Sequence, residues 1–249
     1  MQLVTDPSDF TKFVSAEFEN PTPRKFVYGH PVYKSRRFGN LELWGIGKLC
    51  DFGHVIPGEA PVYKMAQPDC YRAPEILLRA PWGYPIDIWN LALLAWHLIQ
   101  GEPLFKGREL DPETDYVFHT DRCHLAEIVE VLGPPPPEVL EQGAASDTFF
   151  DKYGSFKFEG ADILRPVVYE STGTYDYEGL DNKKRELKDE LTALKGESKE
   201  RFLDFMSQAL TWDPEKRISV DDMFFHPWLR ALDNSGEGYD LDEDGRIIE

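Results

Sequence analysis

The most apolar segment of the chain runs from Pro85 to Gln100. Apolar residues occupy nearly every position, so no polar face repeats at the 3.6-residue period of a helix. This pattern predicts a helix that is buried on every side within a core. Its apolar residues are Ile86, Ile88, Trp89, Leu91, Ala92, Leu93, Leu94, Ala95, Trp96, Leu98 and Ile99.

Two other segments have one apolar face each, which is typical of helices on a protein surface. Asp121 is a candidate N-cap for the first of them, and Gly133 with the following prolines would end it. Ser219 and Asp222 have the spacing of a capping box and predict a last helix. The apolar faces of the first two helices comprise Leu125, Ile128, Val129 and Leu132, and Phe202, Phe205, Met206, Ala209 and Leu210.

The beginning of the chain gives weaker signals. Asp6 and Pro7 resemble a helix cap and a first-turn proline, and Phe10, Phe13 and Val14 would form the apolar face of a short helix. We expect residues 20–40 to form loops or short strands. Leu49 and Cys50 resemble the end of a short strand that leads into Asp51.

Residues from about 133 to 197 read as an insert. The stretch 138–174 has no clear periodicity, whereas residues 182–195 form a charged helix candidate with Leu187, Leu191 and Leu194 on its apolar side. From Asp233 to Glu249 the chain is an acidic, glycine-containing tail that we expect to be disordered.

Length and composition favour a globular protein. The chain has 249 residues, of which 41% are hydrophobic, and it has no run of about eighteen apolar residues that could span a bilayer. Met1 to Pro7 lacks the features of a signal peptide, so we expect an intracellular protein, in the cytoplasm, the nucleus or both. The cysteines Cys50, Cys70 and Cys123 form no C-x-x-C pair and predict reduced thiols.

The formal charge is −18, from 45 acidic and 27 basic residues. This balance repels phosphate backbones and argues against direct nucleic-acid binding, while it attracts cationic partners. An acidic surface can also serve only to keep a protein soluble. The net charge by itself does not decide between solubility and the binding of a cationic partner.

Two short motifs point to chemistry. Asp51-Phe52-Gly53 is followed, after a loop, by Tyr71-Arg72-Ala73-Pro74-Glu75, and such motifs bracket the activation segment of protein kinases. Asp87-Ile88-Trp89 and Trp212-Asp213-Pro214-Glu215-Lys216-Arg217 follow in the same order as in that family. The chain therefore resembles a protein kinase.

The resemblance implies roles for particular residues. Asp51 would hold the Mg²⁺ that bridges the phosphates of ATP, with Phe52 and Gly53 completing its motif. Glu75 and Arg217 would form a buried ion pair. Arg72 and Asp87 would connect the activation segment to the core as scaffold residues.

Several parts of a complete kinase are not found in this sequence. We find no glycine-rich loop, no strand lysine and no catalytic loop with its Asp and Asn, so we assign no catalytic residue. The implied fold is a mainly helical carboxy-terminal kinase lobe over residues 1–232, with one or two short strands near its start and without the β-rich amino-terminal lobe. We expect the isolated chain to be inactive and to lack productive ATP and Mg²⁺ binding.

The resemblance is closest to the kinases of serine/arginine-rich splicing factors. It covers Met1 to about Leu229 and is carried by the stretches Gln67–Glu75, Trp82-Gly83-Tyr84, Asp87–Asn90 and His124-Leu125-Ala126-Glu127. Residues 13–34 are similar to the region that these kinases place between the catalytic loop and Asp-Phe-Gly. Met1 would then follow the catalytic-loop asparagine directly.

Two observations agree with this subfamily. No Ser or Thr lies between Phe52 and Glu75, so phosphoserine or phosphothreonine cannot order that segment. The acidic charge suits a cationic Arg/Ser-rich partner, and the family implies a docking surface in the insert.

Three other signals have simpler explanations. His119-Thr120-Asp121 has the letters of a catalytic loop, but it lies after Asp-Phe-Gly, and we interpret Asp121 as a helix cap. Cys123, His119 and His124 lack a second cysteine pair for a metal site. The acidic tail copies only the opening of a calcium loop.

Three functional hypotheses follow. The chain is the substrate-binding half of a serine/threonine kinase acting on Arg/Ser-rich proteins, which a missing lobe or separate polypeptide completes. Alternatively, it is a non-catalytic pseudokinase module that docks basic Arg/Ser-rich segments or regulates a full-length kinase. A third possibility is an incomplete gene product. We expect no membrane partner.

Overall fold

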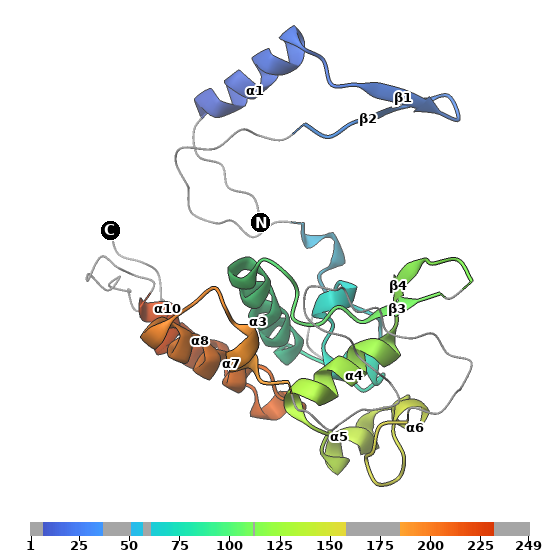
Figure 1. Cartoon of the computed structure of the whole chain (residues 1–249), viewed down its shortest axis with the longest axis vertical. Coiled ribbons are helices and arrows are strands. Elements are labelled where there is room, and N and C mark those ends of the chain that lie inside the picture. Colours follow the sequence, from blue (N-terminus) through green and yellow to red (C-terminus); the bar gives the residue numbers. More distant parts are fainter. Residues whose placement is uncertain (1–6, 37–50, 57–60, 112, 158–184, 232–249) are drawn as a thin grey trace. The chain divides into compact units, whose positions relative to one another are not determined.

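The computed structural model describes residues 7–36, 51–56, 61–111, 113–157 and 185–231. The chain divides into two compact units, Met1–Pro57 and Gly58–Glu249. Each unit is described by itself below, with the element labels of Figure 1.

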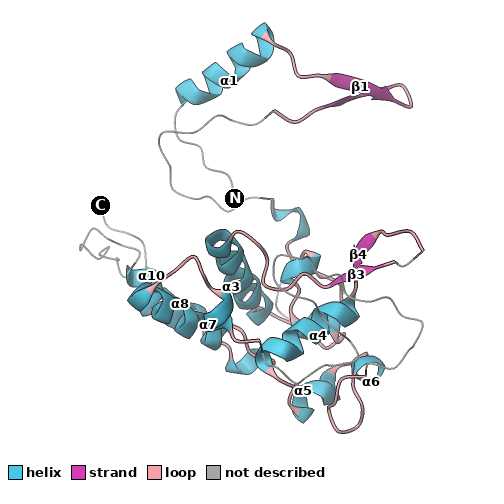
Figure 2. Cartoon of the chain, in the orientation of Figure 1, coloured by secondary structure: helices cyan, strands magenta, loops and turns pink. Residues whose placement is uncertain are grey.

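The first unit contains one helix and one hairpin. Helix α1 spans Pro7–Glu19, and strands β1 (Arg24–Val27) and β2 (His30–Tyr33) pair antiparallel (Figure 2). The strands are joined by Tyr28 and Gly29, which both have positive φ angles of 48° and 80°. A two-residue turn with these angles matches the right-handed twist of the strands. The expectation of loops or short strands after residue 20 is therefore confirmed for this stretch.

One carboxylate ties α1 to the ends of the hairpin. Glu17 accepts hydrogen bonds from the backbone N–H and the hydroxyl of Thr22, both at 2.6 Å, and forms an ion pair with Arg36 at 2.5 Å. The hydroxyl of Thr22 is the main cause that lowers the pKa of Glu17. These contacts fix where the chain leaves the helix and enters β1.

The second unit is mainly helical, with one further strand pair. Three single turns of 3₁₀ helix, one of them in the first unit, span Phe52–His54, Asp69–Tyr71 and Pro214–Lys216. The strands β3 (Arg108–Leu110) and β4 (Val117–His119) form an antiparallel pair. The helices are α2 (Pro74–Leu77), α3 (Pro85–Gln100), α4 (Asp121–Leu132), α5 (Pro137–Gln142), α6 (Ser146–Phe149), α7 (Leu187–Glu190), α8 (Gly196–Ala209), α9 (Val220–Phe224) and α10 (Pro227–Ala231).

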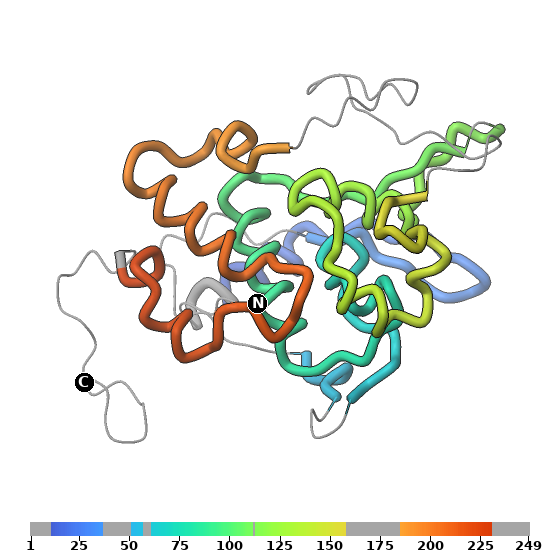
Figure 3. The backbone as a smooth tube through the Cα atoms, turned by 90° about the horizontal axis from the view of Figure 1, so that it is seen from below, coloured from blue at the N-terminus to red at the C-terminus, as the bar shows by residue number. Residues whose placement is uncertain are grey.

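Aromatic side chains form the core of the second unit. Helix α3 packs beside α8 (Figure 3), where the rings of Trp96 and Phe202 stack with their centroids 6.3 Å apart. Phe202 in turn meets Trp228 of α10 at 4.7 Å. On another side of α3, Trp89 stacks on Phe105 at 6.0 Å. Burial of such large rings supplies most of the free energy that holds helices together.

Helix α3 has the predicted bounds, but the prediction that it is buried on every side was wrong. The side chains of Leu91 and Leu98 are 45% and 68% exposed. They lie seven residues apart and so share one face of the helix. Within the described residues of the second unit, no element covers this face. The sequence pattern is that of a central helix, whereas the described packing accounts for only part of its circumference.

Two predictions in the insert also differ from the structure. The helix expected over residues 182–195 is a single turn, α7, because Leu191 leaves the helical conformation and turns into the core with 0% exposure. Residues 182–184 lie outside the described part. The short helices α5 and α6 appear where no periodicity was evident, since elements of four to six residues are too short to show a period.

The other helices are present as predicted where the structure describes them, but α9, which was expected to be the last helix, is followed by α10. Helix α4 ends at Gly133, whose φ is 78°, and Ser219 caps α9 by accepting from the N–H of Asp222 at 3.1 Å. The strand at Leu49 and Cys50 and the acidic tail lie outside the described residues. The described chain is thus mainly helical with short strands, and none of its helices is long and apolar enough to cross a membrane.

Candidate functional site

The predicted ion pair between Glu75 and Arg217 is present, and it joins positions 142 residues apart. The two guanidinium nitrogens Nη1 and Nη2 of Arg217 meet the two carboxylate oxygens of Glu75 at 2.6 and 2.7 Å. Both side chains are buried, with 3% and 1% of their surfaces exposed. This is the parallel two-bond geometry in which arginine binds carboxylates most strongly.

All five N–H donors of Arg217 have acceptors. The Nη1 atom also donates to the carbonyl of Pro85, while Nε and Nη2 both donate to the carbonyl of Thr211. The guanidinium lies 5.1 Å from the ring centroid of Trp89. A buried cation requires such full satisfaction because an unpaired N–H in a core loses its hydration without compensation. The pair therefore connects α2, the start of α3 and the 3₁₀ turn Pro214–Lys216.

Gln67 holds the chain before α2 in place. Its backbone has a φ of 66°, and its side-chain oxygen accepts from the N–H of Ala73 at 2.9 Å. Its side-chain nitrogen donates to the carbonyl of Ile86 at 2.7 Å. One amide thus links residues 67, 73 and 86. In the sequence, Gln67 is only one letter of a motif, because a glutamine gives no signal of a bridging role.

Arg72 connects the same stretch to α4. It donates to Asp69 at 2.6 Å and to Asp121 at 3.3 Å, and its side chain is 12% exposed. The interpretation of Asp121 as the helix cap was wrong. Thr120 is the N-cap of α4 and accepts from the N–H of Cys123 at 3.1 Å, and Asp121 is free to pair with Arg72. These contacts agree with the scaffold role predicted for Arg72.

Asp51, Phe52 and Gly53 are described within the first unit. Asp51 adopts the left-handed conformation, with φ 67° and ψ 56°, and precedes the 3₁₀ turn that contains Phe52 and Gly53. The carboxylate of Asp51 is exposed, and 61% of the Phe52 surface is accessible. Aspartate tolerates this backbone better than most residues, yet the conformation is uncommon and is enriched at functional sites.

Within the described residues, the kinase motif supplies Asp51 as a candidate ligand for Mg²⁺. Within them, no group of three or more His, Cys, Asp or Glu side chains could hold a metal ion. Asp51 offers one carboxylate, and a magnesium ion that bridges phosphates usually takes one or two. The residue type fits its predicted role, but the assignment of Asp51 to metal and cofactor binding stays a prediction.

Asp87 lies in the first turn of α3. Burial of its carboxyl group raises its pKa, although the residue as a whole is exposed. Within the described part of the chain, no hydrogen bond or ion pair to this carboxylate is present.

Two histidines, His119 and the fully buried His124, lie in contact near Arg72. Nothing in the sequence indicated that they pack against each other. The Nε2 of His119 lies 3.1 Å from the Nδ1 of His124, and His124 is fully buried. Burial lowers the pKa of His124 to about 3 and is also the main cause that lowers the pKa of His119. Gly107 lies under the pair, and a Cβ atom there would come within 2.6 Å of the His119 ring. Both rings are therefore neutral packing elements at pH 7.

Glu127 fixes the loop that contains Gly107. Its carboxylate accepts from the backbone N–H of Lys106 at 2.6 Å and from that of Gly107 at 3.2 Å. Burial raises the pKa of Glu127, and the N–H donor of Lys106 is the largest opposing cause. The cysteines Cys70 and Cys123 are free thiols, as predicted, and burial raises the pKa of Cys123 to about 11.

Comparison with known proteins matches residues 42–229 to the family model of the protein kinase domain. A serine/threonine protein kinase of Aspergillus fumigatus is 35% identical over 230 residues, which are 91% of this chain and 52% of that protein. The dual specificity tyrosine-phosphorylation-regulated kinase mbk-2 of Caenorhabditis elegans is 33% identical over 183 residues, or 74% of this chain and 21% of that protein.

The serine/threonine-protein kinase SKY1 of Saccharomyces cerevisiae is 32% identical over 183 residues, or 74% of this chain and 22% of that protein. The chain thus spans about half the length of the Aspergillus kinase. The family match includes the Glu75–Arg217 pair, the Gln67 bridge and Asp51-Phe52-Gly53. On this evidence the chain belongs to the protein kinase family.

Proposed function

We propose that this chain is the substrate-binding half of a serine/threonine protein kinase of the serine/arginine-protein type. When completed by the missing amino-terminal lobe, it transfers the terminal phosphate of ATP to serines in Arg/Ser-rich proteins. The isolated chain binds such segments but does not transfer phosphate. The proposal rests on the family, on the resemblance of the motifs from Gln67 to Glu127, and on the contacts of the segment 66–75.

The observation that carries this proposal is how the segment 66–75 is held. Kinase activation segments are commonly ordered by a phosphorylated residue that pairs with arginine. Here Arg72 already pairs with Asp69 and Asp121, and Gln67 bridges to Ala73 and to α3. With no Ser or Thr between Phe52 and Glu75, side-chain contacts take the place of a phosphate.

The exposed face of α3 supports completion by a further segment. Leu91 and Leu98 place large apolar side chains in water on the most apolar helix of the chain. Covering them would remove apolar surface from water, at about 25 cal/mol per Å². The remaining kinase domain is the partner that we propose for this face. The same partner would contact the carboxylate of Asp87, which has no partner within the described residues.

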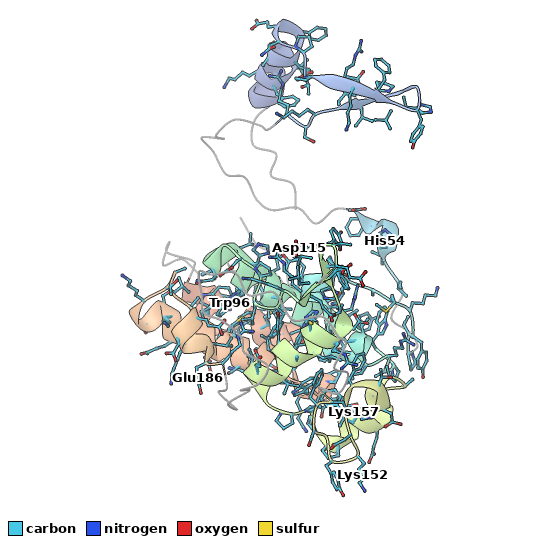
Figure 4. The ribbon with its side chains drawn as sticks, turned by 45° about the vertical axis from the view of Figure 1, so that its right-hand side comes forward. His54, Trp96, Asp115, Lys152, Lys157 and Glu186 are labelled. Atoms are coloured by element: carbon cyan, nitrogen blue, oxygen red, sulfur yellow. The ribbon has the colours of Figure 1, made fainter. Side chains whose placement is uncertain are left out.

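We place the docking surface for Arg/Ser segments on the described part of the insert. Helices α5 and α6 expose the carboxylates of Glu138, Glu141 and Asp147. Figure 4 shows side chains of this region, including the labelled Lys152, projecting into solvent. Exposed carboxylates attract a cationic peptide through long-range forces that salt screens.

The test is the binding of a fluorescent Arg-Ser repeat peptide to the whole chain, measured by anisotropy at about 50 and about 200 mM salt. We expect binding that weakens at the higher salt. The triple variant Glu138→Gln, Glu141→Gln and Asp147→Asn should weaken it further. A matched triple variant outside the insert carries Glu200→Gln, Glu215→Gln and Asp221→Asn, and it should bind nearly as the parent chain does.

Equal loss in both triple variants would contradict the insert as docking surface. Binding that does not depend on salt would contradict docking by charge. The alternative function is a pseudokinase module that binds the same segments without any chemistry. It is favoured by the sequence, in which we find no strand lysine and no catalytic-loop Asp and Asn. It is separated from the first by adding the missing lobe as a second polypeptide and measuring phosphate transfer.

A further inference from the structure

Within the described residues of the first unit, nothing covers either face of the β1–β2 hairpin. All eight strand residues are exposed, and so is the turn, where 98% of the surface of Tyr28 is accessible. Phe26 and Tyr33 lie on one face, 65% and 57% exposed. Figure 4 shows the side chains projecting from both sides of the ribbon. A two-stranded hairpin alone is marginally stable in water, and a further strand or a packing surface usually supports it.

The hydrogen-bond register shows which backbone groups of the hairpin point outward. The N–H of Lys34 donates to the carbonyl of Pro23 at 2.9 Å, so positions 23 and 34 form a hydrogen-bonded pair. Such pairs alternate along an antiparallel ladder, which makes Lys25↔Val32 and Val27↔His30 the other bonded pairs. The N–H and C=O groups of Arg24 and Phe26 therefore point away from β2.

The two edges of the hairpin differ as a result. On β2 the outward positions are Pro31 and Tyr33, and Pro31 has no N–H to donate. Proline is a common means by which proteins block a strand edge against further pairing. On β1 both outward positions keep an N–H and a C=O, and within the described residues no backbone partner occupies them. The edge of β1 is open, whereas that of β2 is blocked.

The hairpin and the residues that follow it in the sequence are strongly basic in an acidic chain. Residues 24–37 contain Arg24, Lys25, Lys34, Arg36 and Arg37 and no acidic residue. Their charge is +5 in a chain whose net charge is −18, so the rest carries −18 − 5 = −23. Arg36 pairs with Glu17, but Arg24, Lys25 and Lys34 have no acidic partner in the part of the chain that the structure describes.

From these observations we propose that the open edge of β1 binds an extended, acidic segment of a partner protein as a third strand. The backbone of the segment pairs with Arg24 and Phe26, and its carboxylates meet Lys25 and Lys34. Strand addition of this kind obtains affinity from main-chain hydrogen bonds and specificity from alternate side chains. The inference goes beyond the proposed function, since the ligand is acidic and the surface lies in the other unit.

Two other occupants fit the observations less well. A single-stranded RNA would suit the basic and aromatic side chains, but it has no peptide groups to pair with an open strand edge. A second copy of this hairpin, paired β1 to β1, would place the cations of both copies side by side. Like charges opposite each other destabilise a sheet.

The experiment titrates the whole chain with a fluorescent acidic peptide of alternating sequence, Glu-Val-Glu-Tyr-Glu-Val-Glu, blocked at both ends. The key comparison is Phe26→Pro against Phe26→Val. Both replace the ring, but only proline removes the outward N–H, and neither removes a ladder hydrogen bond of the hairpin. We expect proline to weaken binding about tenfold relative to valine.

The charge comparison uses Lys25→Glu against Lys188→Glu, an equal change at an exposed lysine of α7. The first should weaken binding about tenfold, and the second should leave it nearly unchanged. Hydrogen exchange of the unmodified chain gives a variant-free readout. We expect the peptide to slow the exchange of residues 24–27.

Equal effects of proline and valine, or unchanged exchange at residues 24–27, would overturn the strand addition. Binding of an oligouridine RNA that depends on Lys25 while the peptide fails to bind would overturn the class of partner. Self-association in sedimentation that Phe26→Pro abolishes would identify a second copy as the occupant. Arg/Ser-peptide binding is measured separately, so failure here leaves the proposed function standing.

Discussion

The substitution Glu75→Gln tests the contact that joins the two ends of the second unit. Glutamine has the shape of glutamate, so it opens no large cavity, but it removes the charge opposite Arg217. Its amide nitrogen must also face one guanidinium nitrogen, donor against donor. Arg217 keeps its bonds to the carbonyls of Pro85 and Thr211. Its two charge-assisted bonds of 2.6 and 2.7 Å to the carboxylate are replaced by a single neutral bond to the amide oxygen.

Breaking one side of a buried ion pair typically costs about 3 to 5 kcal/mol, and the 1% and 3% exposures place this pair in that class. The remaining carbonyl acceptors and the ring of Trp89 favour the lower half of the range. With a urea slope of about 2 kcal/mol per M, the unfolding midpoint should fall by roughly 1.5 to 2 M.

The assay is urea unfolding followed by tryptophan fluorescence. Five of the six tryptophans, all except Trp44, belong to the second unit, so the signal reports mainly on that unit. The control is Glu200→Gln, the same change at an exposed glutamate of α8, which should move the midpoint little. A loss below about 1 kcal/mol for Glu75→Gln, the usual worth of a surface pair, would refute the reasoning.

Three further predictions concern α4 and its surroundings. Thr120→Ala removes the hydrogen bond from the N–H of Cys123 and should lower the free energy of unfolding in urea by about 1 kcal/mol. Thr120→Ser keeps the hydroxyl and should lower it much less. Equal losses in the two variants would contradict the role of Thr120 as helix cap. Gly107→Ala should cost more than about 2 kcal/mol, because the new Cβ would meet the ring of His119 at a φ of +55°, and an unchanged midpoint would show that the loop shifts freely. Burial lowers the pKa of His124 from 6.5 to about 3, so below pH 6.5 the unfolded chain binds a proton that the folded chain excludes. The free energy of unfolding should therefore fall by about 2 kcal/mol between pH 6.5 and pH 5. His124→Leu should reduce this dependence of stability on pH.

The sequence predicted elements well where their signals are local. Helix α4 ends at Gly133, and Ser219 caps α9 at the position that the spacing predicted. The bounds of α3 follow from a nearly continuous apolar run with Pro85 at one end and Gly101 at the other. Caps, prolines and glycines act within a few residues, so a single sequence contains their full effect.

Contacts between distant residues needed either the family or the structure. The pairing of Glu75 with Arg217 was inferred from the resemblance, because nothing local relates two residues 142 positions apart. The bond from Arg72 to Asp121 was missed, as Asp121 also has the signature of a cap. The turn of Leu191 into the core ended a helix that local propensity would have extended.

The candidate site divides in the same way. The kinase motifs in the sequence made Asp51, Arg72 and Glu75 candidate site residues. The bridging role of Gln67 and the burial of His124 depend on packing and could not be predicted in this way. The open edge of β1 came from the register of a hairpin that the sequence indicated only as loops or short strands. Register and exposure depend on tertiary context, which residue patterns do not contain.

The measurement that tests the account most directly is phosphate transfer by the isolated chain. The chain is incubated with Mg²⁺, labelled ATP and an Arg-Ser repeat peptide at a concentration where anisotropy shows the peptide to be bound. The account predicts salt-sensitive binding and no labelled peptide. Robust transfer that Asp51→Ala abolishes would contradict it, because the chain would then hold a complete catalytic site.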